Sequence, residues 1–186
     1  MPSSSLQPKK TLLEESQVRR VVRRIAGEIV EQHGGTAGLQ LVGIRTRGVP
    51  FAERLAAEIR EMEGAEVPLG ILDITLYRDD LSAIAPQPVV KQTRLPEPID
   101  DRVIVLCDDV LYTGRTIRAA LDALIDYGRP RAVRLAVLVD RGHRELPIQA
   151  DFVGRALRTA PDEHVEVRFE ETDGATDVRI LSREEA

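Results

Sequence analysis

The chain contains few of the residues on which several classes of protein depend. It has no tryptophan, only 3% aromatic residues and a single cysteine, Cys107. So few aromatic rings argue against the base-stacking platforms of proteins that bind single-stranded nucleic acid. A lone cysteine cannot form an internal disulfide, which is typical of proteins from a reducing compartment. We therefore expect a cytoplasmic protein.

The sequence also lacks an apolar run long enough to span a bilayer, and its first residues do not resemble a secretory signal. We expect no association with a membrane. The 186 residues carry a formal net charge of −5. This acidic balance disfavours non-specific binding of nucleic acid but permits a local basic face. With 42% hydrophobic and 31% charged residues, the chain can bury a core and stay in solution.

Patterns typical of strands and helices alternate along the chain. Residues 1–12 show no periodicity and predict a flexible leader, followed by a single domain over residues 13–186. Helical spacing of apolar residues predicts three helices, over residues 14–33, 50–62 and 114–127. Apolar runs predict strands over residues 39–44, 67–74, 103–107, 132–139, 151–154, 164–170 and 177–181. This alternation predicts an α/β fold with a mostly parallel central sheet flanked by helices.

The most informative segment joins the apolar strand at residues 103–107 to the helix that follows it. Two carboxylates, Asp108 and Asp109, stand at the start of this segment, and Thr113, Gly114 and Thr116 stand at its end. The small residues allow backbone N–H groups to converge on an anion at the helix N-terminus, as in a phosphate cradle. Adjacent carboxylates would repel phosphate, so we expect them to bind sugar hydroxyls or a divalent cation.

A phosphate cradle beside a pair of acids predicts a site for ribose 5-phosphate at the carboxyl edge of the sheet. The alternative interpretation is an acidic strand end and a capped helix with no ligand. The coincidence of acid pair, Gly/Thr loop and helix start favours the binding site. The glycine motifs of P-loop NTPases and of dinucleotide-binding enzymes are absent from the sequence, which counts against both classes.

Residues 104–116 resemble the thirteen-residue signature of the type I phosphoribosyltransferases, which bind phosphoribosyl pyrophosphate (PRPP). Residues 73–81 and 138–148 resemble the branch of that family whose members are both uracil phosphoribosyltransferases and regulators of the pyrimidine operon. The resemblance extends from about residue 13 to about residue 178. It implies the type I phosphoribosyltransferase fold, with a small hood and a flexible loop over the site.

The resemblance also implies roles for individual residues. Asp108, Asp109 and Arg47 would be the catalytic residues. PRPP would be bound by Arg45, Thr46, Arg47, Asp108, Asp109, Val110, Leu111, Tyr112, Thr113, Gly114, Arg115 and Thr116. The flexible loop would use Tyr77, Arg78, Asp79 and Asp80, and the uracil or UMP site would use Asp140 and Arg141. A single cysteine and three scattered histidines provide no metal cage, so Mg²⁺ would arrive with PRPP.

In the implied reaction, N1 of uracil displaces pyrophosphate from the anomeric carbon of PRPP and gives UMP. The second implied activity is attenuation of transcription by a UMP-bound protein that binds pyrimidine leader mRNA. The basic candidates for this contact are Arg20, Arg23, Arg24, Arg144 and Arg155. A solvated face with ion pairs explains the first helix equally well, because Glu15 precedes Arg19 and Arg24 precedes Glu28 by four residues. The family also forms homodimers and larger assemblies.

The sequence departs from the family at Gly27, at Gln149 and over residues 155–160, where many members carry other residues on their RNA face. We therefore hypothesise an intact transferase site and a weakened, altered or lost RNA activity. Two alternatives stay open. The chain is an RNA-binding nucleotide sensor with little catalysis, or it is a type I phosphoribosyltransferase for another base, such as a purine or orotate.

Overall fold

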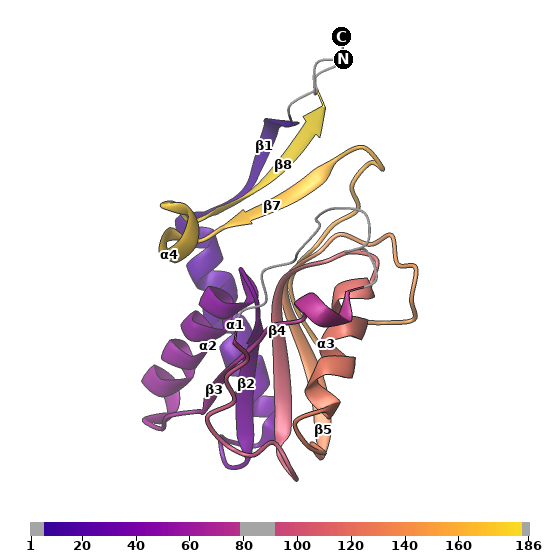
Figure 1. The fold of residues 1–186 in the computed structure, drawn as a ribbon. Coiled ribbons are helices and arrows are strands. Elements are labelled where there is room, and N and C mark those ends of the chain that lie inside the picture. Colours follow the sequence, from indigo (N-terminus) through magenta and orange to yellow (C-terminus); the bar gives the residue numbers. More distant parts are fainter. Residues whose placement is uncertain (1–5, 79–91, 184–186) are drawn as a thin grey trace.

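A computed structural model describes residues 6–78 and 92–183, and all structural statements below concern these ranges. Within them the chain forms one parallel sheet of five strands and one antiparallel sheet of three (Figure 1). The parallel sheet has the order β3-β2-β4-β5-β6, which places β4 at its centre. Its strands are β2 (Leu39–Ile44), β3 (Leu69–Leu72), β4 (Val103–Leu111), β5 (Ala132–Asp140) and β6 (Phe152–Ala156).

Helices cover both faces of the parallel sheet. On one face, α1 (Glu15–His33) and α2 (Gly48–Glu63) pack their buried side chains, such as Ile25 and Phe51, against the strands. On the other face, α3 (Arg115–Ile125) does the same with Ile117 and Leu124. The α/β fold with a parallel sheet between helices is confirmed. The three helices agree with the prediction to within about two residues at each end.

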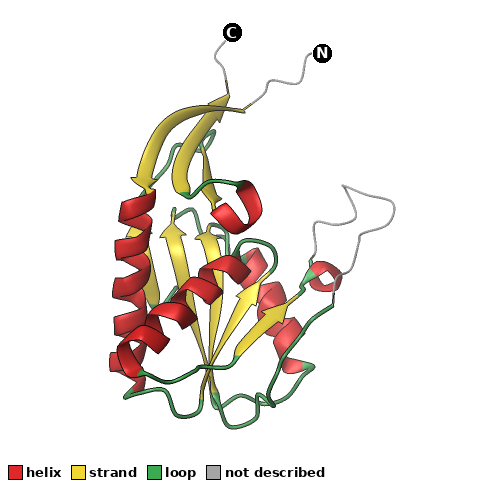
Figure 2. Cartoon of the chain, turned by 90° about the vertical axis from the view of Figure 1, so that its left-hand side faces the viewer, coloured by secondary structure: helices red, strands yellow, loops and turns green. Residues whose placement is uncertain are grey.

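The second sheet forms a hood at the carboxyl end of the parallel strands (Figure 2). It consists of β1 (Leu6–Glu14), β8 (Asp177–Arg183) and β7 (His164–Arg168), with the short helix α4 (Glu170–Asp173) between β7 and β8. Residues 6–12, which we expected to belong to a flexible leader, form most of β1 and pair with β8. Their sequence gave no signal, because nearly all of β1 is exposed and its partner lies at the other end of the chain.

Two strand boundaries differ from the prediction in a way that concerns function. Strand β4 continues to Leu111, so that Asp108 and Asp109 lie inside a strand, with Asp108 paired to Val137 of β5. We expected this strand to end at Cys107, because two carboxylates interrupt its apolar pattern. Strand β3 covers only residues 69–72, and a 3₁₀ turn, η1 (Thr75–Tyr77), follows it.

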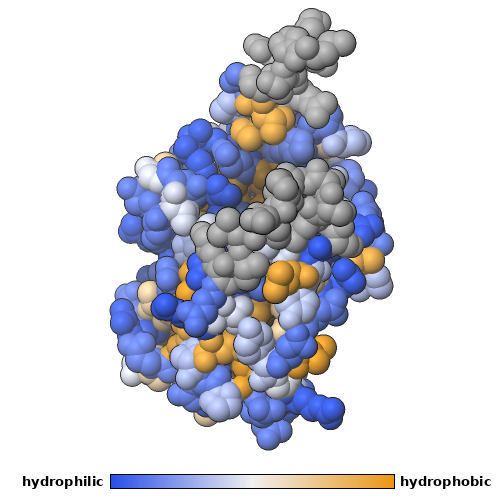
Figure 3. Space-filling view, viewed as in Figure 1, coloured by the Kyte–Doolittle hydropathy of each residue, from blue (hydrophilic) through white to orange (hydrophobic). Residues whose placement is uncertain are grey.

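The described surface is mainly polar. Within residues 6–78 and 92–183, no helix is both long and apolar enough to cross a membrane. Large apolar side chains are nevertheless exposed around η1 and α3, where Figure 3 shows orange residues among blue ones. The exposed apolar side chains are those of Leu76 and Ile125, and the side chain of Tyr127, just after α3, is exposed as well.

Gly48, the first residue of α2, makes a close approach that positions the site. A Cβ atom on Gly48 would lie 2.3 Å from the carbonyl oxygen of Cys107, the residue before the acid pair. The loop that precedes α2 therefore lies directly against β4 only because residue 48 has no side chain.

We expect Gly48→Ala to lower the free energy of unfolding by about 2 kcal/mol, because the backbone of β4 must move to admit the methyl group. Gly27→Ala is the matched control. Gly27 lies in the middle of α1 with open space around its Cα, and alanine there should raise stability by roughly 0.5–1 kcal/mol. Urea unfolding measures both variants. Equal stability of Gly48→Ala and wild type would contradict the close approach.

Candidate active site

The carboxyl ends of the parallel strands bring the predicted site residues to one edge of the sheet. Arg45 to Arg47 follow β2, the acid pair lies near the end of β4, and Asp140 ends β5. The 3₁₀ turn η1 and Arg78 follow β3 at the same edge. This edge, beneath the hood, is where open α/β sheets bind their ligands.

The acid pair is held in a region of low solvent access. Asp108 is only 6% exposed, and one of its oxygens accepts a hydrogen bond from the backbone N–H of Asp109 at 3.1 Å. Burial raises the pKa of the Asp108 carboxyl well above its usual value, and the neighbouring charge of Asp109 raises it further. Burial also raises the pKa of Asp109, against the opposing effect of the Val110 backbone and of Arg47. The two carboxyls therefore favour cations or hydrogen-bond donors nearby.

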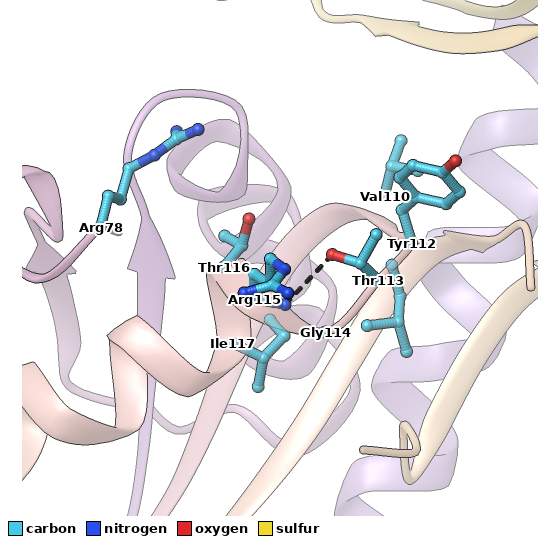
Figure 4. Close-up of a pocket in the computed structure, with 9 residues that line it drawn as sticks. Arg78, Val110, Tyr112, Thr113, Gly114, Arg115, Thr116 and Ile117 are labelled. Atoms are coloured by element: carbon cyan, nitrogen blue, oxygen red, sulfur yellow. Dashed lines mark hydrogen bonds between the residues drawn. The ribbon is translucent and has the colours of Figure 1, made fainter. Parts of the chain in front are cut away.

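A cavity of about 230 Å³ lies at the start of α3, and its lining begins at Val110, the residue after the acid pair. Figure 4 shows its lining, with Arg78 and Tyr112 on opposite sides. Apart from Arg78, the cavity is lined by the seven residues from Val110 to Thr116, which we expected to bind a phosphate, and by Ile117. Gly114 has a φ of 93°, a conformation that suits glycine and turns the chain from the loop into α3. The cavity has the position and the backbone geometry of a phosphate cradle.

The cradle is supported by the segment that follows β5. The carbonyl oxygen of Thr113 accepts hydrogen bonds from the backbone N–H groups of Glu145 and Leu146, at 3.0 and 3.1 Å. Arg144 donates to the carbonyl oxygens of Tyr112 and Ile148 and to the carboxylate of Asp140. These contacts fix the loop without using the N–H groups at the start of α3.

Arg144 was one of our candidates for an RNA contact, which stays a prediction, and the structure shows its contacts within the protein. Its guanidinium points into the protein and its donors bind three separate segments. Through these contacts Arg144 holds the loop before α3 and the turn after β5 together. The sequence gave no warning, because an arginine in a loop between charged residues is normally solvated.

Arg141 was expected to contact uracil, but its side chain is buried, with 4% exposed. Nε donates to the hydroxyl of Thr159 at 3.1 Å, and Nη2 donates to the carbonyl oxygen of Glu163 at 2.6 Å. The guanidinium lies over the ring of Tyr112, 4.0 Å from its centre. The Nε and Nη2 donors of the guanidinium are thus bound within the protein, and Arg141 joins the cradle to the segment that leads into the hood. Neither Thr159 nor the stacking on Tyr112 was foreseen from the sequence.

The predicted pyrophosphate loop follows β2 and is joined to the hood. The peptide bond between Arg45 and Thr46 is cis. Arg47 forms a bidentate ion pair with Asp173 of α4, with Nε and Nη2 at 3.2 and 2.8 Å from the two carboxylate oxygens. The hydrogen bond from Arg47 lowers the pKa of Asp173 to about 2. Sequence reasoning missed Asp173, because it lies 126 residues from Arg47 in an acidic stretch that looks like an ordinary solvated surface.

The remaining predicted residues divide into two groups. Of the predicted loop residues, Tyr77 donates a hydrogen bond to Asp126 at the end of α3, Arg78 lines the cavity, and Asp79 and Asp80 lie outside the described residues. Of the basic candidates, Arg24 binds the carbonyl oxygens of Val153 and Gly154. The others are exposed: Arg23 lies 3.9 Å from Glu58, and Arg20 and Arg155 make no ion pair within the described part of the chain.

No group of three or more His, Cys, Asp or Glu side chains in residues 6–78 and 92–183 has the arrangement of a metal cage. The donor set at the site is the carboxylate pair itself. A buried and a half-buried carboxylate with raised pKa values suit a divalent cation that has further ligands of its own, such as the oxygens of a bound diphosphate.

The parallel sheet, the cradle at the start of α3 and the acid pair define a phosphoribosyltransferase. The family model described as "Phosphoribosyl transferase domain" matches residues 9–171, and the chain belongs to this family. Similar folds are found in solved hypoxanthine phosphoribosyltransferases. The structure from Trypanosoma cruzi matches with a TM-score of 0.73 and 18% identity over 97% of this chain and 94% of its own. That from Staphylococcus aureus matches with a TM-score of 0.68 and 20% identity, over 95% and 93%.

Within that family the relatives are much closer. The protein from Deinococcus radiodurans named "Bifunctional protein PyrR" is 57% identical over 178 residues, which cover 96% of this chain and 97% of the relative. The protein of the same name from Thermus thermophilus is 60% identical over 178 residues, with 96% and 98% covered. The chain belongs to the PyrR family. Both comparisons confirm the resemblance found in the sequence.

The raised pKa of Asp108 predicts a stability that depends on pH. The folded state favours its protonated form, so its contribution to stability is present below pH 4 and is lost as the pH rises through the raised pKa. We expect Asp108→Asn, measured without divalent cations, to be about 1–2 kcal/mol more stable than wild type at pH 8. The two proteins should converge near pH 4.

Urea unfolding across this pH range is the measurement. Asp162→Asn is the control, because Asp162 is exposed and its replacement should leave the pH dependence of wild type unchanged. A difference between Asp108→Asn and wild type that does not grow with pH would show that the ionised acid pair causes no strain in the fold.

Proposed function

We propose that the protein is a uracil phosphoribosyltransferase, which converts uracil and PRPP to UMP and pyrophosphate. The observation that carries the proposal is the acid pair, buried Asp108 and half-buried Asp109, which directly precedes in the chain the 110–116 loop that lines the cavity. A phosphate cradle and two acceptors for a diol are the groups that a ribose 5-phosphate requires. Membership of the PyrR family supports the choice of reaction.

In this proposal the backbone N–H groups of residues 112–116 bind the 5-phosphate, and the hydroxyl of Thr113 or Thr116 adds a donor. Asp108 and Asp109 accept hydrogen bonds from the ribose hydroxyls. Arg45, Thr46 and Arg47 receive the pyrophosphate, whose oxygens suit the fork of the Arg47 guanidinium. Each group of PRPP thus has a partner at a separate strand end.

Catalysis then consists of positioning and of charge stabilisation. As the bond to pyrophosphate breaks, positive charge develops on the ribose ring, where the carboxylates of Asp108 and Asp109 lie. Negative charge develops on the leaving group, where Arg47 lies. Mg²⁺ bound together with PRPP would supply further positive charge to the pyrophosphate. The described residues suggest no side chain as a general base.

We propose that the turn after β5 receives the base. Asp140 accepts hydrogen bonds from the Gly142 N–H and from Arg144, so the turn has a fixed shape. Arg141 stacks on Tyr112 and thereby connects this turn to the cradle. In this proposal its guanidinium does not donate hydrogen bonds to the base. Backbone amide and carbonyl groups of the turn remain to distinguish uracil from other bases.

We further propose a regulatory role, in which the UMP-bound protein binds a pyrimidine leader mRNA in the cytoplasm. The word "bifunctional" in the name of the relatives and the exposure of Arg20 and Arg155 support it. The departures at Gly27, Gln149 and residues 155–160 predict that RNA binding is weakened or altered. The exposed apolar residues around η1 and α3 suit a homodimer or a larger homo-oligomer.

A panel of uracil, hypoxanthine and orotate, each with PRPP and Mg²⁺, tests the transferase. Of the three bases, we expect only uracil to be turned over. Asp109→Asn should lower this turnover by about 100-fold or more, because an acceptor next to the cationic sugar loses its charge. Its stability should change far less than its turnover. Turnover with hypoxanthine or orotate instead of uracil would contradict the choice of base, and full activity of Asp109→Asn would remove the acid pair from the mechanism.

A gel-shift with the organism's own pyrimidine leader RNA, in the presence of UMP, tests the regulatory role. We expect weak binding by wild type, and tighter binding by Gln149→Arg, because the substitution adds a charge that can contact phosphate. Arg155→Gln should weaken the binding that remains. Tight and specific binding by wild type would contradict the idea of a weakened RNA face.

A further inference from the structure

Two bidentate ion pairs join helix α2 and its preceding loop to helix α4 of the hood. Arg47, immediately before α2, binds Asp173, and Arg54, two turns later in α2, binds Glu171. Both pairs use Nε and Nη2 of the arginine. They differ in position, because Arg47 lies at the proposed pyrophosphate loop and Arg54 lies farther along α2.

The pair of Arg47 and Asp173, called the inner pair below, occupies the Arg47 donors that a pyrophosphate would use. The Asp173 carboxylate accepts from Nε and Nη2 of Arg47 in the same fork geometry by which a guanidinium binds two phosphate oxygens. The carboxylate therefore stands where two oxygens of an anionic ligand would stand. Arg47 cannot make both sets of contacts with these donors at once.

Asp173 also accepts hydrogen bonds from groups other than Arg47. Its Oδ2 atom accepts hydrogen bonds from the backbone N–H of Phe169 at 3.0 Å and from the hydroxyl of Thr172 at 2.8 Å. Both partners belong to the turn around α4. The carboxylate is thus held in place by the hood itself, and loss of Arg47 would not leave it without donors.

The pair of Arg54 and Glu171, the outer pair, attaches the hood to α2 independently of Arg47. The Arg54 guanidinium binds Glu171 at 2.9 and 2.8 Å, donates to the hydroxyl of Thr176, and lies over the buried ring of Phe169 at 5.0 Å. These contacts attach α4 to α2 whether or not Arg47 is engaged. A rotation of the Arg47 side chain is therefore sufficient to free its donors, and the hood need not separate from the sheet.

We propose that Asp173 is a positioning residue that acts as a built-in counter-ion of the pyrophosphate site: it holds Arg47 at the edge of the site and is exchanged for the pyrophosphate group of the substrate. The proposal rests on the proposed function, because it assigns Arg47 to the pyrophosphate. The exchange would keep Arg47 paired whether or not a ligand is bound, and Asp109 and Glu166 are the other negative charges that act on it. The competing carboxylate weakens the binding of any ligand that carries a pyrophosphate.

The test compares Asp173→Asn with Glu171→Gln. The asparagine retains an acceptor for Phe169 and Thr172 but has no negative charge for Arg47. We expect Asp173→Asn to lower the Kd for inorganic pyrophosphate and the KM for PRPP by about three- to tenfold, with no rise in kcat. The Kd for UMP, which has no pyrophosphate, should not change. Glu171→Gln removes the outer pair and should leave all of these constants as in wild type.

A second measurement needs no variant of the hood. In wild-type protein labelled with ¹⁵N-arginine, pyrophosphate should shift the Nε–H signal of Arg47 and leave that of Arg54 in place, with the Arg47→Lys protein used for assignment. Unchanged or weaker binding of pyrophosphate by Asp173→Asn, or the same shift of both arginine signals, would overturn the exchange while leaving the transferase intact. Failure of wild type to bind either PRPP or pyrophosphate would overturn the proposed function and the exchange together.

Discussion

The structure of the site depends on two carboxylates placed side by side in a buried strand. Asp108 and Asp109 gain little solvation from water, and each raises the electrostatic cost of ionising the other. Such a pair is tolerated at the centre of a fold only where cations or donors come close. The surrounding elements meet this requirement from two sides, because Arg47 lowers the pKa of Asp109 and Arg78 lowers that of Asp108. Ionising both carboxyls costs stability, and their charge suits a cationic sugar.

The same strand end explains why the chain after β5 contains so many arginines. Arg141 and Arg144 donate hydrogen bonds to backbone carbonyls and to the side chains of Thr159 and Asp140. These contacts hold the cradle, the turn after β5 and the segment that leads into the hood together. Guanidinium suits this task, since one planar group reaches several acceptors in fixed directions. A cradle built from backbone N–H groups needs such support, because its geometry is set by its neighbours rather than by its own side chains.

The alternation of apolar runs was sufficient to predict the parallel sheet and its three helices, and the 104–116 segment pointed to the place where the structure has a cavity. These features are local, since each depends on residues within one element and the next. The internal contacts of Arg144 and Arg141 were not predicted, because most of their acceptors are backbone atoms, which no sequence pattern marks. Strand β1 was missed because its exposed residues carry no alternation, and its pairing with β8 joins the two ends of the chain. Asp173 was missed for the same reason, as its partner lies on a distant strand end.

Charge balance connects these long-range contacts to the chemistry. Asp173, Asp109 and Glu166 are the negative charges that act on Arg47, and the hydrogen bond with Asp173 raises the pKa of the guanidinium. A substrate with a pyrophosphate adds more negative charge at this point, so it must bring cations with it or displace a resident carboxylate. Because Arg54 and Glu171 hold the hood separately, displacement at Arg47 changes the charge of the site without unfolding the structure above it. In this proposal the Arg47–Asp173 pair exchanges with the ligand, and the Arg54–Glu171 pair attaches the hood.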